Sequence, residues 1–201
     1  MNFFIERGFW GLSKISDLTE MLVENPVIAA IRNDENLEDV LASKAQIVFV
    51  LYGNILSITE ICSKLKKAGK TIFVHADLID GLRGDKVGIE FINKYLAPDG
   101  IITTKVNCIK YAKHLGLYTI LRLFIIDSLS IKTGVKNIQE TQPCAIEIMP
   151  GVAGKAIRNL KNATNVPIIA GGLIDKKKDV IDALSAGAVA ISTTAEELWK
   201  M

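Results

Sequence analysis

The segment Pro167–Trp199, PIIAGGLIDKKKDVIDALSAGAVAISTTAEELW, sets out the repeating unit of this chain. It begins with a short apolar run, Pro167–Ala170, and a second apolar run covers Ala188–Ser192. Between them, apolar residues such as Val180 and Leu184 recur one helical turn apart, which predicts an amphipathic helix. Runs that are apolar throughout are typical of parallel strands buried on both faces. The segment therefore predicts a strand, a crossover helix and a parallel strand.

The same unit repeats along the rest of the chain. Six further apolar runs come before this segment: Pro26–Ile31, Ile47–Leu51, Thr71–Ala76, Gly100–Thr103, Tyr118–Ile125 and Ala145–Met149. Their spacing leaves room for one helix between successive strands and for little else. Eight such units without an antiparallel interruption favour a closed (β/α)₈ barrel, the TIM barrel, over an open doubly wound sheet. We predict an α/β protein with one domain over residues 1–201, of which 26–201 form the barrel.

Residues 1–25 precede the first predicted strand. They contain an apolar stripe with a helical period, made of Ile15, Leu18, Met21 and Leu22. We expect this extension to form a helix that caps the N-terminal end of the barrel. Glu6 and Arg7 interrupt the apolar start that a signal peptide needs, and no run approaches the roughly 20 residues that span a bilayer. We therefore expect a cytoplasmic protein with no membrane partner.

Composition excludes some classes of protein. Hydrophobic residues make up 49 % of the 201 residues and charged residues 23 %, the usual mixture for a globular domain rather than a disordered chain. The net charge of +2 neither demands nor excludes an anionic partner. Cys62, Cys108 and Cys144 are too widely spaced for a CxxC pair, so we expect three packing residues in a reducing compartment.

The strongest functional signal follows the last two predicted strands. Functional residues of (β/α)₈ barrels lie at the carboxyl ends of the strands, and a phosphate site often follows strands seven and eight. Gly171 and Gly172 come directly after the seventh apolar run, where missing side chains let backbone amides approach an anion. Ser192 and Thr193 add hydroxyl groups at the eighth. We predict a phosphate site here, and a tight turn with simple hydroxyl caps is the alternative.

Local signals mark several helix ends. Three hydroxyl–carboxylate pairs fit a capping box: Ser57 with Glu60, Thr193 with Glu196, and Thr194 with Glu197. The last two are alternative starts for a short helix that ends near Trp199, and a helix start there would favour a bound anion. Gly69 and Gly116 stand where left-handed helix caps are expected.

Charged and polar residues also end or follow the middle strands: His75, Asp77, Lys105, Arg122 and Glu147. Residues two apart on a strand face the same side, so His75 and Asp77 should point together, and Thr103 should point with Lys105. Both signs of charge suit a polyol phosphate, because carboxylates and imidazole bind hydroxyls while cations balance the anion.

Each of these residues also has a plainer interpretation. His75 could be a core histidine bonded to Asp77. Glu147, between Ile146 and Ile148, must be paired or face the mouth of the barrel, and we favour the mouth. No further His or Cys joins His75, so we expect no metal and no cofactor.

Two predicted helices carry clustered basic residues: Lys155, Arg158 and Lys161 on one, and Lys176, Lys177 and Lys178 at the next. Consecutive barrel helices are neighbours, so the two groups could form one surface patch. A solvated face is the ordinary interpretation of such a pattern. No aromatic residues lie between the lysines, so the pattern alone does not indicate RNA binding.

Several stretches together resemble one known family. They are VIAAIRNDENLEDVL, GKTIFVHADLIDGLRGD, DGIITTK, LRLFIIDS, AIEIMPG, VPIIAGGLI and AGAVAISTTAEELW. The chain resembles the glycerol-3-phosphate-responsive antiterminator family of bacterial glycerol uptake operons over nearly its whole length. FVHADLIDGL and IIAGGLI, together with LFIIDS, are the most specific of these strings.

The resemblance implies a TIM barrel that binds glycerol 3-phosphate and acts on leader RNA to let transcription pass a terminator, without catalysis. It implies ligand contacts at His75, Asp77, Lys105, Arg122, Glu147, Gly151, Gly171, Gly172, Ser192 and Thr193. The chain departs from the family pattern at Asn54, Leu121 and Gly154, which leaves the phosphate loops intact.

Two other functions stay open from the residues alone. Asp77, Lys105 and Glu147 could serve as acid, base or Schiff-base groups in a lyase or isomerase of a phosphorylated triose or sugar. A paralogue that senses the same phosphate and binds a protein instead of RNA is the other. A homodimer is one route by which a single barrel could couple ligand binding to RNA binding.

Overall fold

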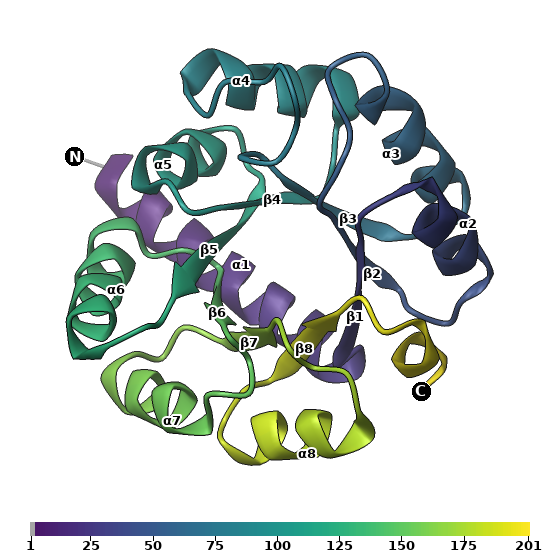
Figure 1. Cartoon of the computed structure of the whole chain (residues 1–201). Helices are drawn as coiled ribbons and strands as arrows, with labels where there is room; N and C mark the ends of the chain where they lie inside the picture. The colour runs from purple at the N-terminus through teal and green to yellow at the C-terminus, as the bar shows by residue number, and fades with distance from the viewer. Residues whose placement is uncertain (1–2) are drawn as a thin grey trace.

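The computed structural model describes the backbone of residues 3–201 and the side chains of residues 13–201. Eight parallel strands follow one another around a barrel: β1 Val27–Ile31, β2 Ile47–Val50, β3 Thr71–His75, β4 Gly100–Thr103, β5 Tyr118–Phe124, β6 Ala145–Met149, β7 Ile168–Gly171 and β8 Ala190–Thr193. Each strand pairs with the next, and β1 pairs with β8, so the sheet closes (Figure 1). The predicted TIM barrel is confirmed.

The helices alternate with these strands, and all but α1 lie around the outside of the barrel (Figure 1). They are α1 Phe3–Glu24, α2 Asp34–Ala42, α3 Ile58–Lys67, α4 Lys86–Phe91 with the π-helical turn η1 Ile92–Leu96, α5 Val106–His114, α6 Ser128–Thr141, α7 Gly154–Ala163, α8 Lys177–Ser185 and the 3₁₀ helix η2 Glu196–Lys200. Within residues 3–201, no helix has both the length and the apolar character that crossing a membrane would require.

Alternation along the strands separates an outer and an inner apolar layer. Outward-facing residues pack against the surrounding helices, whereas inward-facing residues such as Phe49 and Phe73 fill the barrel. Leu18 and Leu22 of α1 belong to this inner cluster and are fully buried. In Figure 1, α1 passes behind the strands. The extra helix therefore caps the N-terminal end of the barrel, as predicted.

Several local predictions are also confirmed. Gly69 and Gly116 adopt φ values of +73° and +79°, the left-handed conformation expected where these helices end. Cys62, Cys108 and Cys144 are buried free thiols, as expected of packing residues. The ends of the observed strands differ from the predicted ends by at most two residues.

The predicted capping box at Ser57 is wrong. Ser57 already has a helical backbone, with φ −101° and ψ −27°, and its side chain makes no capping hydrogen bond. The Asn54 carboxamide instead accepts hydrogen bonds from the amides of Leu56 and Ser57 at 2.9 and 3.1 Å. An Asx turn therefore leads into α3, because Asn54 offers an acceptor before the backbone becomes helical.

The capping boxes predicted after β8 are wrong as well. Ala195 precedes η2 without a side-chain cap, and η2 is a five-residue 3₁₀ helix. The Thr193 hydroxyl donates to the Ile174 carbonyl at 2.6 Å. It also accepts from the Ala195 amide at 3.0 Å, so it joins the loop after β7 to the turn after β8.

Candidate functional site

A buried ion pair lies inside the barrel near the mouth, the open end at the carboxyl ends of the strands. The Arg122 Nε on β5 donates to Glu147 Oε2 on β6 at 2.6 Å, and Ser192 Oγ on β8 donates to Glu147 Oε1 at 2.6 Å. Glu147 is completely buried and Arg122 is 7 % exposed. The sequence left open whether Glu147 is paired or faces the mouth, and in the structure it is paired and also lines the cavity at the mouth.

Gly171 ends β7 beside this ion pair, so the strand runs one residue further than the sequence suggested. A β-carbon at Gly171 would lie 2.5 Å from Glu147 Oε1 and 2.6 Å from Ser192 Oγ. These distances are too short for any side chain. Gly171 therefore makes room for the carboxylate and its hydroxyl partner.

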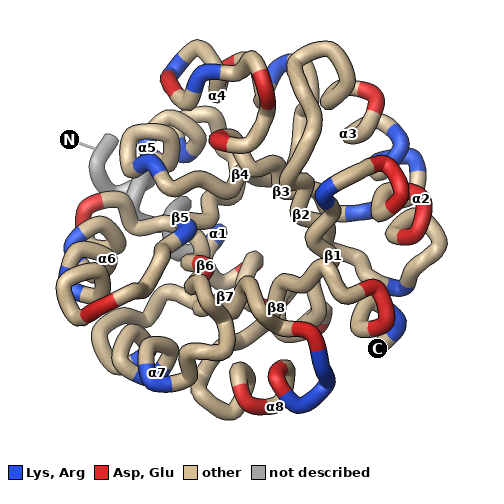
Figure 2. Tube along the Cα trace, viewed as in Figure 1, with Lys and Arg blue, Asp and Glu red and all other residues tan. Residues whose placement is uncertain are grey.

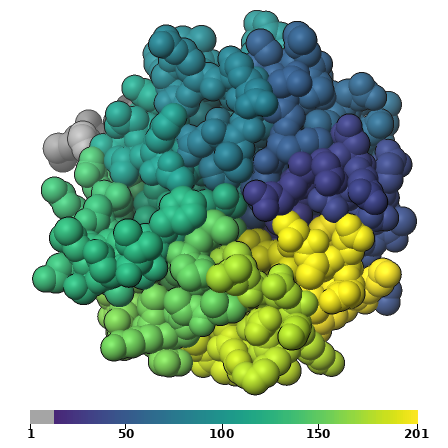
Figure 3. Space-filling model, in the orientation of Figure 1, coloured from purple at the N-terminus to yellow at the C-terminus, as the bar shows by residue number. Residues whose placement is uncertain are grey.

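A cavity of about 490 Å³ opens above the ion pair, at the ends of β1 and of β5 to β8. Its polar lining includes Arg32, Arg122, Glu147, Asp175, Ser192 and Thr194. Its apolar lining includes Leu51, Leu78, Phe124 and Leu173. In the space-filling view, the first and last segments of the barrel meet side by side at this end of the molecule (Figure 3). A polar floor beneath apolar walls is the usual form of a small-molecule site.

The loop after β7 lines the cavity and contains backbone amides that have no acceptor among the described residues. Gly172 and Leu173 have φ values of +77° and +60°. The amides of Gly172, Leu173 and Thr194 donate to no acceptor among the described residues, and all three residues line the cavity. A left-handed backbone costs a residue such as Leu about 1–2 kcal/mol, and such strain is concentrated at ligand sites. Neighbouring free amides form a concavity that binds anions.

Gly151, also predicted at the phosphate, has its amide already engaged. It donates to the carbonyls of Gly171 and Gly172 at 2.6 and 3.0 Å. A β-carbon there would come within 2.9 Å of the β7 backbone. Gly151 therefore ties the loop after β6 to the loop after β7, and this contact holds Gly172 in position.

Asp77 and Lys105 form a separate group beside the cavity, outside its lining. Lys105 Nζ lies 3.6 Å from Asp77 Oδ1, and the Thr103 hydroxyl donates to the same carboxylate at 3.0 Å. Thr103 and Lys105 thus face the same side, as expected. Burial opposes ionisation of Asp77, but hydrogen bonds from the Thr104 amide and hydroxyl outweigh it and lower the pKa of this carboxyl group. Asp77 is therefore an ionised, well-satisfied anchor for the loop after β4.

His75 is a buried neutral imidazole. It is 2 % exposed, its Nδ1 accepts from the Asp77 amide at 3.3 Å, and its Nε2 has no partner among the described residues. Its pKa is lowered to about 4, chiefly by burial and also by the Arg122 cation, while the charge of Asp77 opposes the shift. The core-histidine interpretation fits, with the bond made to the backbone of Asp77 rather than to its carboxylate.

Several residues that line the cavity were not assigned to the ligand from the sequence, among them Arg32, Leu173, Asp175 and Thr194. Arg32 directly follows β1, and no described residue accepts a hydrogen bond from its guanidinium group. Its position after a strand was a signal, but nothing local distinguished it from other surface arginines. Leu173 gave no signal, because only the left-handed backbone brings it to the cavity.

The geometry defines a (β/α)₈ barrel with a solvent-open cavity at the carboxyl ends of its strands, the position where such barrels hold small molecules. A family model described as glycerol-3-phosphate responsive antiterminator matches residues 27–199. The chain belongs to this family.

Individual relatives are similar over nearly their full length. A crystal structure of a glycerol uptake operon antiterminator regulatory protein from Listeria monocytogenes is 34 % identical, has a TM-score of 0.84, and the match covers 86 % of this chain and 94 % of that one. An antiterminator-related protein from Thermotoga maritima is 32 % identical with a TM-score of 0.79, over 88 % and 99 %. The uncharacterized protein YgcP of Escherichia coli (strain K12) is 40 % identical over 92 % of this chain and 96 % of its own.

More distant barrels include aldolases at 9 to 16 % identity. Likeness at this level extends to the fold alone.

Proposed function

We propose that this chain is a regulator that binds glycerol 3-phosphate in the mouth cavity and acts on the leader RNA of glycerol uptake genes, so that transcription passes a terminator. Membership in the antiterminator family supports the regulatory role. The main structural support is the group of free amides of Gly172, Leu173 and Thr194 in a cavity that also holds Arg32 and Arg122. Donors of this kind suit a phosphate better than a neutral molecule.

The remaining cavity groups suit a short polyol. Arg122 uses only Nε on Glu147, so its terminal nitrogens have no acceptor among the described residues. The Asp175 carboxylate at the rim and the Ser192 oxygen can accept hydrogen bonds from hydroxyl groups. Charge-assisted hydrogen bonds contribute about 1.5–3 kcal/mol each, so several of them together support micromolar binding, which needs about 8 kcal/mol.

A lyase or isomerase reaction in the same cavity is not favoured. The family is one of regulators, and Lys105, the lysine considered for a Schiff base, pairs with Asp77 outside the cavity lining. A Schiff base requires the amine to reach a substrate carbonyl. The regulatory function therefore accounts for more of the observations.

Calorimetry with a neutral control tests the ligand half of the proposal. Gly172→Asp places a carboxylate beside the free amides, and Gly172→Asn has nearly the same shape without the charge. Both residues tolerate a positive φ, and the nearest obstacle is the flexible end of Met149. We expect glycerol 3-phosphate to bind the unaltered protein, and Gly172→Asp to lose at least about 100-fold in affinity through charge repulsion. Gly172→Asn should lose much less.

Glycerol and inorganic phosphate complete the comparison. Phosphate should bind weakly, and glycerol should give no heat. If the unaltered protein gives no heat with millimolar glycerol 3-phosphate, the proposed ligand is wrong. Equal losses in the Asp and Asn variants would mean that the free amides do not contact the phosphate.

A further inference from the structure

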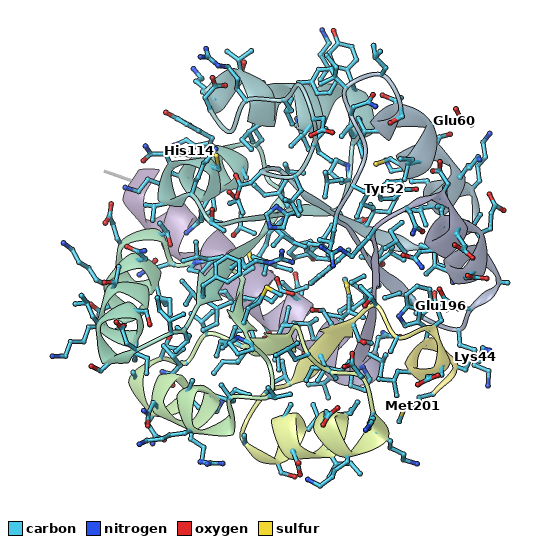
Figure 4. The ribbon with its side chains drawn as sticks, viewed as in Figure 1. Lys44, Tyr52, Glu60, His114, Glu196 and Met201 are labelled. Carbon is cyan, nitrogen blue, oxygen red and sulfur yellow. The ribbon has the colours of Figure 1, made fainter. Side chains whose placement is uncertain are left out.

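Surface charge is distributed unevenly around the barrel. α2 carries Asp34, Glu35, Glu38 and Asp39 and no basic residue. Next to it, η2 adds Glu196, which accepts a hydrogen bond from Asn36 of α2 at 2.8 Å. Glu196 is labelled beside α2 in Figure 4, and Figure 2 shows acidic residues gathered on this side. The four carboxylates of α2 therefore make this helix an unfavourable contact for a polyanion.

Basic residues occur on most of the outer helices, and those of α6 and α7 lie on the side of the barrel opposite α2 (Figure 2). Lys155, Arg158 and Lys161 are the only charged residues of α7, and all three are exposed. Lys132 and Lys136 of α6 are exposed as well. None of these five side chains forms a salt bridge with any described residue. We call these five residues the α6–α7 basic face.

Nearby acidic residues do not neutralise this face. Glu140 is the one acidic residue within α6, and it pairs with Lys110 of α5 at 2.6 Å. The hydrogen bond from Lys110 lowers the pKa of Glu140, with a smaller contribution from the charge of Lys136. Asp127 caps the start of α6 by accepting from the Ser130 amide at 2.7 Å.

The patch considered from the sequence, on α7 and α8, differs from this face. Lys178 pairs with Asp182, and Asp179 accepts from the backbone amides of Asp175 and Lys176. Helix α8 therefore carries both signs of charge, and its lysines have acidic neighbours. Unlike Lys178 of α8, the cations of α7 and of its other neighbour, α6, have no salt-bridge partner among the described residues.

The α6–α7 basic face has the chemistry of a phosphate-backbone contact. Successive cations on α7 are three residues apart, a rise of about 4.5 Å along the helix axis. Neither α6 nor α7 contains an aromatic residue, so unpaired bases have no ring to stack on. Paired RNA is bound mainly through its backbone and shape, which requires cations rather than rings. Resting on the function proposed above, we infer that the α6–α7 basic face binds the backbone of a paired RNA stem.

The position of α7 gives the ligand a physical connection to this face. α7 begins at Gly154, shortly after Gly151, whose amide bonds to the Gly171 and Gly172 carbonyls. A phosphate held by the Gly172 amide would restrain the same peptide segment that fixes the start of α7.

Equilibrium RNA binding with a matched control variant tests the inference. The probe is a labelled stem-loop from the leader of glycerol uptake genes, with millimolar glycerol 3-phosphate present, over a salt series. The test variant is Lys155→Gln/Arg158→Gln/Lys161→Gln. The control, Lys44→Gln/Lys66→Gln/Lys67→Gln, removes three exposed and unpaired cations elsewhere, and Lys44 is labelled on the α2 side in Figure 4.

We expect the test variant to bind RNA at least about tenfold more weakly, and its slope of log affinity against log salt to fall by about 2–3, because each phosphate contact contributes about 0.9. The control should stay within about twofold of the unaltered protein. Calorimetric binding of glycerol 3-phosphate should be the same in all three proteins, which checks that they are folded.

Other outcomes are informative in different ways. Unchanged RNA binding in the test variant, equal losses in both variants, or tighter binding of a single strand of equal length would overturn this inference alone. If the unaltered protein binds no RNA, both the inference and the RNA half of the proposed function fail.

Discussion

Glu147 is a buried carboxylate with two hydrogen-bond partners inside the barrel. Its oxygens accept from Arg122 and Ser192, and no water-exposed surface remains on it. Removing one member of a buried ion pair is costly, because the other charge stays behind without compensation. Substitutions at this ion pair should therefore have a large effect on the free energy of unfolding.

Glu147→Gln should destabilise the protein by about 3 kcal/mol, since the amide preserves the shape but leaves the Arg122 cation unpaired. Urea unfolding at neutral pH measures this. The double variant Glu147→Gln/Arg122→Met removes the stranded charge and should recover part of the loss. A cost below about 0.5 kcal/mol for Glu147→Gln would mean that solvent, not Glu147, satisfies Arg122.

Individual side chains were only partly predictable from the sequence. Arg122 and Glu147 were selected separately because each interrupts an apolar strand, but their pairing depends on the register of β5 against β6. Lys105 was expected to balance the ligand charge, yet it pairs with Asp77 and is not among the residues that line the cavity. Both outcomes depend on contacts between residues far apart in the sequence, which the residue types alone do not reveal.

The capping helix α1 illustrates how one element completes the barrel. Leu18 is fully buried in the inner cluster, whereas Val23 of the same helix is 59 % exposed. The barrel interior at this end is filled by side chains, so a missing Leu leaves a void that its neighbours cannot close.

Leu18→Ala should therefore lower the free energy of unfolding by about 3 kcal/mol. Val23→Ala, in the same helix, should change it by less than about 0.5 kcal/mol. Thermal and urea unfolding of both variants give the comparison. Similar small effects for both would show that α1 is not part of the folded core.

Strands were easier to predict than loops. Continuous apolar runs gave all eight strands to within two residues at each end, because burial on both faces leaves no room for polar residues. The capping boxes failed at Ser57 and Thr193, where Asn54 and the Ile174 carbonyl supplied competing partners. The positive φ of Leu173 contradicts its local preference and follows from the loop geometry.

The stability of the protein should depend on pH through His75. The pKa of His75 is about 4 in the folded protein, against about 6.5 in the unfolded chain. Between these pH values the unfolded chain binds a proton and the folded protein does not. The contribution of His75 to the free energy of unfolding is complete above about pH 6.5, and it is lost as the pH falls from 6.5 towards 4. Each pKa unit corresponds to about 1.4 kcal/mol, so this group contributes about 3 kcal/mol.

Urea unfolding at several pH values, compared with His75→Asn, measures this dependence. The Asn side chain keeps an acceptor near the position of Nδ1, so the hydrogen bond from the Asp77 amide has a replacement. We expect the variant to lose less stability than the unaltered protein between pH 6.5 and 4.5. Parallel curves for the two proteins would show that His75 is not the group responsible.

Closing the barrel requires Val27 to pair beside Ile191, near opposite ends of the sequence. During translation, the first strand leaves the ribosome long before its final neighbour has been made. Until then both edge strands of the incomplete sheet have unpaired backbone amides and carbonyls, which can pair with the strands of other nascent chains. Ser192 and Thr194 lie in β8 and directly after it, so the cavity at the mouth is complete only when all eight strands have been made.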